Sequence, residues 1–329
     1  MRLSQGRTRE RRPFLSIAIV LVMALLISGC IGESKPAHWP TRDEKIPADM
    51  VKITPSTDLS PPVLHLDAWQ TPVPMPAPIS SAGAEDSPYM TLDGNTFYFF
   101  FTPDVRLSAQ QQLAPGATGI YYSTKVGNNW TMPQRARLEK DPTMALDGCP
   151  TVRGNVLWFC SVRNGGYREI DLYTADIGDG KFTNIKNAGK RINKEVQVGE
   201  MDFGPNGTEI IFHNNKLGGK GKEDIFVTRE VNGVWQDAVP VDAVNTADTD
   251  GWPFITPDGK ELWLTRWYQG TPGVFRSLRN GTAWGPPELV VSSFAGEPNL
   301  DALGNLYFVH HYYNNGTMLE ADIYVAYKK

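Results

Sequence analysis

The feature that most constrains the fold is an internal repeat that begins near residue 62 and continues to residue 329. Each copy contains a Gly-centred turn between apolar, aromatic-rich runs, as at Asp93-Gly94 and Pro257-Asp258-Gly259. Asp-Gly and Asn-Gly turns between apolar runs are strong hairpin signals because both residues tolerate positive φ. The end of a copy is marked by an aromatic side chain, at Trp130, Phe182, Trp235 and Trp284. The repeat therefore predicts antiparallel strands joined by tight turns.

Four short strands per copy are typical of a β-propeller blade, and no segment has a sustained helical period. Five copies are present, and the fifth lacks its fourth strand. The missing signature occurs before the first copy, where Trp69-Gln70-Thr71-Pro72 resembles Trp130-Thr131-Met132-Pro133. We therefore predict an all-β, five-bladed β-propeller over 62–329, whose last blade is completed by an N-terminal strand.

The N-terminus has the pattern of an export signal. Basic residues precede an apolar run over 14–27 that is too short to span a membrane. Leu26-Ile27-Ser28-Gly29-Cys30 resembles a bacterial lipobox, which implies a signal peptide over 1–29 and lipidation of Cys30. Arg11-Arg12 leaves both the Sec and the twin-arginine route open. We expect a protein anchored by lipid to a cell-envelope membrane, on the periplasmic face or at the cell surface.

Composition limits the partners. Residues 30–61 are rich in proline and predict a semi-extended tether. The part after residue 29 carries 27 basic and 35 acidic residues, which excludes the large basic patch that nucleic-acid binding requires. Three cysteines are too few for a multi-cysteine zinc pattern. We expect a monomer with no cofactor and no metal site, although an ion in the channel is left open.

Two family resemblances follow from the repeat. The stretch 253–262, with Pro257-Asp258-Gly259, resembles the WD-related repeat of the TolB family, which implies a propeller used as a binding platform. A fainter resemblance is to the five-bladed glycoside hydrolase family 43. It implies an inverting hydrolase in which Asp86 is the base, Asp147 adjusts a pKa and Glu200 is the acid.

In a propeller, the start of each first strand and the loop after each second strand meet on one face. The side chains expected to bind a ligand there are Arg163, His213, Asp250, Trp252, Arg266, Trp267, Tyr268, Glu297, His310 and His311. Carboxylate, guanidinium and aromatic groups together suit sugars, because the rings cover apolar sugar faces and the charged groups bind vicinal hydroxyls. This combination favours a carbohydrate ligand.

Three functions remain open at this stage. The favoured one is a non-enzymatic module that binds a glycan, a peptide or a partner protein through this face. The second is the inverting glycoside hydrolase, and the third is a scaffold subunit of an envelope complex. Asp250 and Glu297 extend the acidic series to copies four and five, which favours a repeat feature over a catalytic set.

Two cysteines flank the turn of the second copy. Cys149 and Cys160 are equidistant from Gly154-Asn155, so strict antiparallel pairing would place them opposite each other at about 5.5 Å between Cα atoms. That separation is compatible with a disulfide. We predict a Cys149–Cys160 bridge, with two reduced, buried thiols as the alternative.

Overall fold

The computed structural model describes residues 40–113, 116–139 and 145–329. This part of the chain is almost entirely β-structure, as predicted, with one short helix α2 (Ala109–Leu113) and a π-helical segment, Arg191–Val196. Neither helix is long and apolar enough to cross a membrane. Cys30 and the predicted signal peptide lie outside the described residues.

The strands form antiparallel groups that follow one another along the chain. The first group is β3 (Ala84–Met90), β4 (Thr96–Thr102), β5 (Gly119–Val126), β6 (Asn129–Trp130) and β7 (Gln134–Arg135). The second is β8 (Leu146–Arg153), β9 (Val156–Val162), β10 (Asp171–Gly178) and β11 (Lys181–Asn187). The third is β12 (Met201–Phe203), β13 (Glu209–Asn214), β14 (Asp224–Val231), β15 (Val234–Trp235) and β16 (Val239–Pro240).

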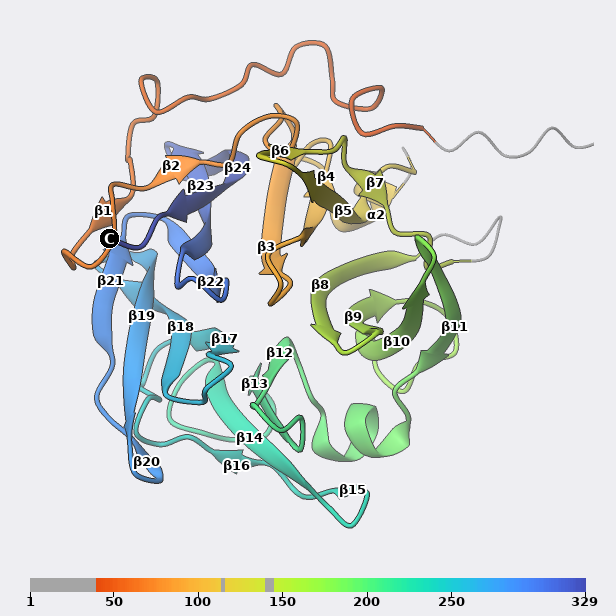
Figure 1. Ribbon diagram of the computed structural model, residues 1–329, viewed down its shortest axis with the longest axis vertical. Coiled ribbons are helices and arrows are strands. Elements are labelled where there is room, and N and C mark those ends of the chain that lie inside the picture. Colours follow the sequence, from red (N-terminus) through yellow and green to blue (C-terminus); the bar gives the residue numbers. More distant parts are fainter. Residues whose placement is uncertain (1–39, 114–115, 140–144) are drawn as a thin grey trace, which may run out of the picture. The chain divides into compact units, whose positions relative to one another are not determined.

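The remaining strands continue this order. The fourth group is β17 (Asp250–Ile255), β18 (Glu261–Tyr268), β19 (Thr271–Asn280), β20 (Ala283–Trp284) and β21 (Glu288–Ser292). The fifth is β22 (Ala295–Leu300), β23 (Leu306–Asn314) and β24 (Thr317–Ala326). The groups surround a common axis, and the first strand of each lies nearest to it (Figure 1). This radial arrangement of antiparallel sheets is that of a β-propeller.

The ring is closed by strands from both ends of its sequence. β2 (Val73–Pro74) pairs antiparallel with β24, which confirms the predicted N-terminal strand in the last group. β1 (Val63–Leu64) extends the fourth group by pairing with β21. Trp69 lies between these two strands, 1% exposed, and packs edge-on against Trp263. The edge of the fifth group is therefore paired, which removes an exposed strand edge.

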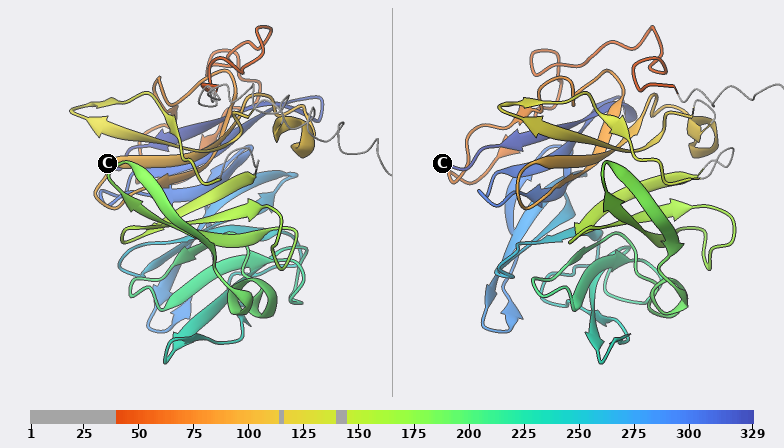
Figure 2. Two further views of the ribbon diagram at one scale, coloured as in Figure 1. Left: turned by 90° about the vertical axis from the view of Figure 1, so that its right-hand side faces the viewer. Right: turned by 45° about the vertical axis from the view of Figure 1, so that its right-hand side comes forward.

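Residues 40–61 lack strands but make specific contacts with the first and fifth groups. The Arg42 guanidinium donates to the carbonyl oxygen of Ile79 and to the carboxylate of Glu85. The Lys52 ammonium contacts the carboxylates of Glu320 and Asp322. The segment follows the outside of these groups in Figure 1 and in the two views of Figure 2. We call residues 40–61 the strap, because its described side chains bind the propeller instead of extending away from it.

Candidate functional site

The innermost strands share a β-bulge that faces the axis. In β3, β8, β17 and β22 the register shifts by one residue at the same point of each strand. The bulged residues with positive φ are Ser87, Cys149, Trp252 and Glu297, each followed by proline. In the third group, Glu200 occupies the same place in the sequence pattern. A non-glycine residue in this backbone region costs about 1 to 3 kcal/mol, and such residues cluster at functional sites.

The residue before the bulge is glycine in four groups and Asp86 in the first. Space explains the glycine at Gly199, where a Cβ atom would lie 2.2 Å from the carbonyl oxygen of His213. At Gly251 a Cβ atom would lie 3.3 Å from the His213 ring. Asp86 therefore places a carboxylate where the other copies have no side chain.

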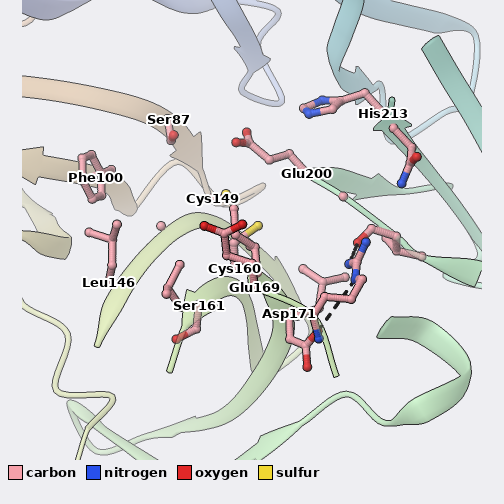
Figure 3. A pocket seen from close by; sticks show the side chains of 18 of the residues that line it. Ser87, Phe100, Leu146, Cys149, Cys160, Ser161, Glu169, Asp171, Glu200 and His213 are labelled. Atoms are coloured by element: carbon pink, nitrogen blue, oxygen red, sulfur yellow. Dashed lines mark hydrogen bonds and ion pairs between the residues drawn. The ribbon is translucent and has the colours of Figure 1, made fainter. Parts of the chain in front are cut away.

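A pocket of about 470 Å³ lies at the axis. Its lining includes Asp86, Ser87, Cys149, Glu200 and His213. Figure 3 shows Ser87, Cys149 and Glu200 around one space, with the His213 ring on the adjoining side. The sequence predicted Asp86, Glu200 and His213 for the site, missed Ser87, and assigned Cys149 to a disulfide.

A second pocket, also of about 470 Å³, has mainly aromatic walls. Its lining includes Trp252, Trp267, Phe294, His311 and Tyr313. The rings of Phe294 and Tyr313 stack with their centroids 4.8 Å apart. Glu297 lines both pockets, so an acidic side chain stands where the axial and the aromatic pocket adjoin.

The axial carboxyl groups influence one another. Burial raises the pKa of Glu200 to about 7, and the charge of Asp86 adds to this shift. Burial also raises the pKa of Glu297 well above its usual value, with contributions from Asp86 and Glu200. The Ser87 hydroxyl donates to Glu297 at 3.0 Å. Within the described residues, no ion pair joins any of the three carboxyl groups to a basic side chain.

His213 is a neutral acceptor at this site. Its Nδ1 atom accepts a hydrogen bond from the backbone N–H of Trp252 at 2.9 Å. Burial lowers the pKa of His213 to about 4. Its ring lies 4.9 Å from the Trp252 ring, between centroids. The imidazole therefore fixes the position of Trp252, which faces the aromatic pocket.

The catalytic candidate Asp147 and the ligand-binding candidates Arg163, Asp250 and Arg266 form two ion pairs with each other. Asp147 is 2% exposed and pairs with Arg163 at 2.6 Å, and Asp250 is fully buried and pairs with Arg266 at 2.5 Å. None of these four side chains lines either pocket. The sequence comparison aligned Asp147 with Asp86, but register shows that Asp147 matches Glu85, one residue earlier. Asp147 therefore stands one position away from the place that the prediction gave it and does not line the pocket.

The other predicted residues divide between site and core. Trp267, 44% exposed, and His311 line the aromatic pocket. His310 is fully buried, and its Nε2 atom lies 3.0 Å from Asp58 of the strap. Tyr268 packs against Phe275 and lines neither pocket. Of these four residues, Trp267 and His311 line a pocket.

The predicted pairing of Cys149 with Cys160 is wrong. The bulge places Gly148 opposite Cys160, and Cys149 has φ of +53°. Both cysteines are free thiols. They remain neighbours that line the same pocket, and burial raises the pKa of Cys149. The equal count on either side of the turn missed the extra residue of the bulge.

Comparison with known proteins gives structural matches only. No family model and no curated protein matches the sequence. TolB from Acinetobacter baumannii is 15% identical with a TM-score of 0.45, over 75% of this chain and 55% of its own. Bacteroides ovatus xyloglucan PUL GH43B is 14% identical with a TM-score of 0.46, over 77% and 53%. A xylan β-1,4-xylosidase from Bacillus halodurans is 11% identical with a TM-score of 0.45, over 76% and 53%.

This chain thus spans about half the length of these three proteins. Because the identities are low and the TM-scores lie below 0.5, the fold assignment rests on the strand pairing described above. No activity is transferred from these proteins.

Proposed function

We propose that this chain is a five-bladed β-propeller that binds a glycan at its axis, as an exported module anchored through Cys30. The observation that carries this proposal is that Glu297 lines two pockets, one with carboxyl groups that form no ion pair in the described part of the chain and the other with aromatic rings. Carboxylates accept hydrogen bonds from sugar hydroxyls, and flat rings cover apolar sugar faces.

A glycan array with the purified protein tests this proposal. Trp267→Ala is expected to weaken binding about fivefold or more, because an aromatic contact of this kind contributes about 1 kcal/mol or more. Tyr327→Ala is the matched control, since Tyr327 is 43% exposed and lines neither pocket. Equal binding by both variants would contradict the proposed face, and a blank array would contradict the glycan ligand.

Hydrolysis is the second candidate, favoured by Glu200. A carboxyl group with a pKa near 7 is suited to act as general acid, and Asp86 lines the same pocket as a candidate base. Glu200→Gln separates the two functions. A hydrolase loses turnover while it still binds the glycan, whereas a binding module shows no turnover even before the substitution.

A further inference from the structure

Side chains from three different strands lie close together. They are Asp86 of β3, Glu297 of β22 and His311 of β23, and their ligand atoms all lie within 4.8 Å of one another. Asp86 and Glu297 come from neighbouring groups that are far apart in the sequence. The cluster is therefore produced by ring closure and not by a local turn.

The contact between the two carboxyl groups needs a positive charge. Carboxylate oxygens of Asp86 and Glu297 lie within 4.8 Å of each other. Two carboxylates in contact repel unless they share a proton or a cation lies between them. Neither forms an ion pair with a basic side chain in the described part of the chain. A proton shared by the two carboxylates would need no further ligand atom. The His311 imidazole offers a third ligand atom, which a bound cation would use.

The positions of these donors are supported by their surroundings. The backbone N–H of Glu297 donates to the Thr265 hydroxyl at 2.8 Å, and the Ser87 hydroxyl donates to the Glu297 carboxylate. The backbone N–H of His311 donates to the carbonyl oxygen of Phe294 at 3.0 Å. The backbone bonds fix the main chain at Glu297 and His311, and the Ser87 hydroxyl orients the carboxylate itself, as hydrogen bonds to metal ligands do.

We propose that Asp86, Glu297 and His311 bind a divalent transition-metal ion of the Zn²⁺ class. Two carboxylate oxygens and one imidazole nitrogen match the donors that Zn²⁺ accepts, whereas Ca²⁺ prefers oxygen ligands alone. Three protein ligands leave a coordination position for water or a bound molecule. Because Glu297 borders both pockets, that position faces the space where the proposed ligand binds.

The first experiment uses the unmodified protein after treatment with a chelator. Titration with Zn²⁺ in a calorimeter is expected to show one bound ion per chain, and an excess of Ca²⁺ is expected not to displace it. Zn²⁺ is also expected to protect His311 from acylation by diethyl pyrocarbonate, measured by peptide mass spectrometry, while His65 stays reactive. No saturable binding, displacement by Ca²⁺ or unprotected His311 would each overturn the proposal.

The second experiment uses variants. His311→Ala and Glu297→Gln are each expected to weaken Zn²⁺ binding at least about tenfold, since each removes a ligand. His65→Ala is the matched control, because His65 contacts Ser292 at the outer edge of the fourth group and is not in the cluster. Unchanged affinity in both cluster variants would overturn the site. Neither experiment contains a glycan, so its result is independent of the proposed function.

Discussion

The second and fourth groups differ from the first and fifth in where a buried charged side chain finds its partner. In the second group Asp147 pairs with Arg163, and in the fourth Asp250 pairs with Arg266. Both arginines also donate to a backbone carbonyl, of Leu138 or of Val244. Each of these groups contains both members of its pair, about 16 residues apart in its own hairpin.

The first and fifth groups, which flank the ring closure, contain one member of such a pair, and the strap supplies the other. Glu85 of the first group contacts Arg42, and His310 of the fifth contacts Asp58. His310 lies opposite Ala295 as Arg266 lies opposite Asp250, so Asp58 replaces an acidic side chain that the fifth group lacks. A buried charged side chain thus has its partner in the same hairpin in the second and fourth groups, and in the strap in the first and fifth groups.

The largest effect is expected from deletion of residues 30–61. Fragment 62–329 would lose Arg42, Lys52 and Asp58 together, and it would leave Glu320 and Asp322 buried without a cation. Loss of one buried partner costs about 3 to 5 kcal/mol. The fragment is therefore expected to fail to fold, or to have a much lower melting temperature than the chain that keeps residues 30–61. Thermal unfolding of both proteins is the measurement. Equal melting temperatures would mean that the strap is a tether after all.

Arg42→Ala and Arg163→Ala are expected to destabilise the fold by similar amounts. Each variant removes the guanidinium beside a buried acidic side chain and the donor to a backbone carbonyl, a loss of about 3 kcal/mol. Denaturant unfolding gives the free energy, with Lys45→Ala, an exposed strap residue, as control. A loss for Arg42→Ala as small as that of the control would show that a partner supplied from a distance does not replace a local one.

Asp202→Asn tests how a buried negative charge affects stability at the contact between the third and fourth groups. Asp202 accepts the N–H of Ile255 in the next group, as the neutral Asn299 accepts that of Met90. Burial raises the pKa of Asp202 to about 7. Its contribution to stability is complete below about pH 4 and is lost as the pH rises to about 7, because the unfolded chain ionises first.

The substitution is therefore expected to stabilise the protein by up to about 4 kcal/mol at pH 8 and to have little effect at pH 4. Denaturant unfolding at both pH values checks this. A difference between the proteins that does not change with pH would mean that Asp202 is already ionised in the fold.

The smallest effect is expected from Asp58→Asn. Burial lowers the pKa of His310, so the pair with Asp58 joins a neutral imidazole to a carboxylate. An amide oxygen can accept the same hydrogen bond, and the expected loss is about 1 kcal/mol. Asp250→Asn is the comparison, because it leaves the Arg266 charge without its partner and should cost several times more. Equal losses would show that His310 is charged in the fold.

The sequence predicts the strand groups well because Gly-centred turns and alternating apolar residues are local signals. It predicts the closing strand from a repeated Trp-x-x-Pro signature, although the observed pairing is at Val73–Pro74. It does not predict the strap contacts, since nothing local in Arg42 or Asp58 indicates a partner more than 40 residues away. Composition predicted a tether over residues 30–61, because proline-rich segments without periodicity are usually extended linkers.

The site is predicted in part, and the errors have one physical cause. Sequence reasoning placed Asp86, Glu200 and Trp267 on the axial face, but it did not foresee the bulge and so assigned Asp147 to the pocket. Ser87, Phe294 and Tyr313 were missed as lining residues. Two signals were available: proline after the bulged residue in four copies, and an aspartate where the other copies have glycine.

The way in which the ring closes sets the order in which the chain can fold. Lys52 and Ser80 bind Asp322, and Val73 pairs with Val325, so these contacts join positions about 240 to 270 residues apart. During synthesis, Lys52, Val73 and Ser80 therefore have no partners until nearly all later residues have been made. Contacts between distant positions form slowly, because a long loop must close first. Closure is accordingly expected to be the last step of folding, and a ribosome that stalls before residue 320 would leave the earlier strands with an open edge.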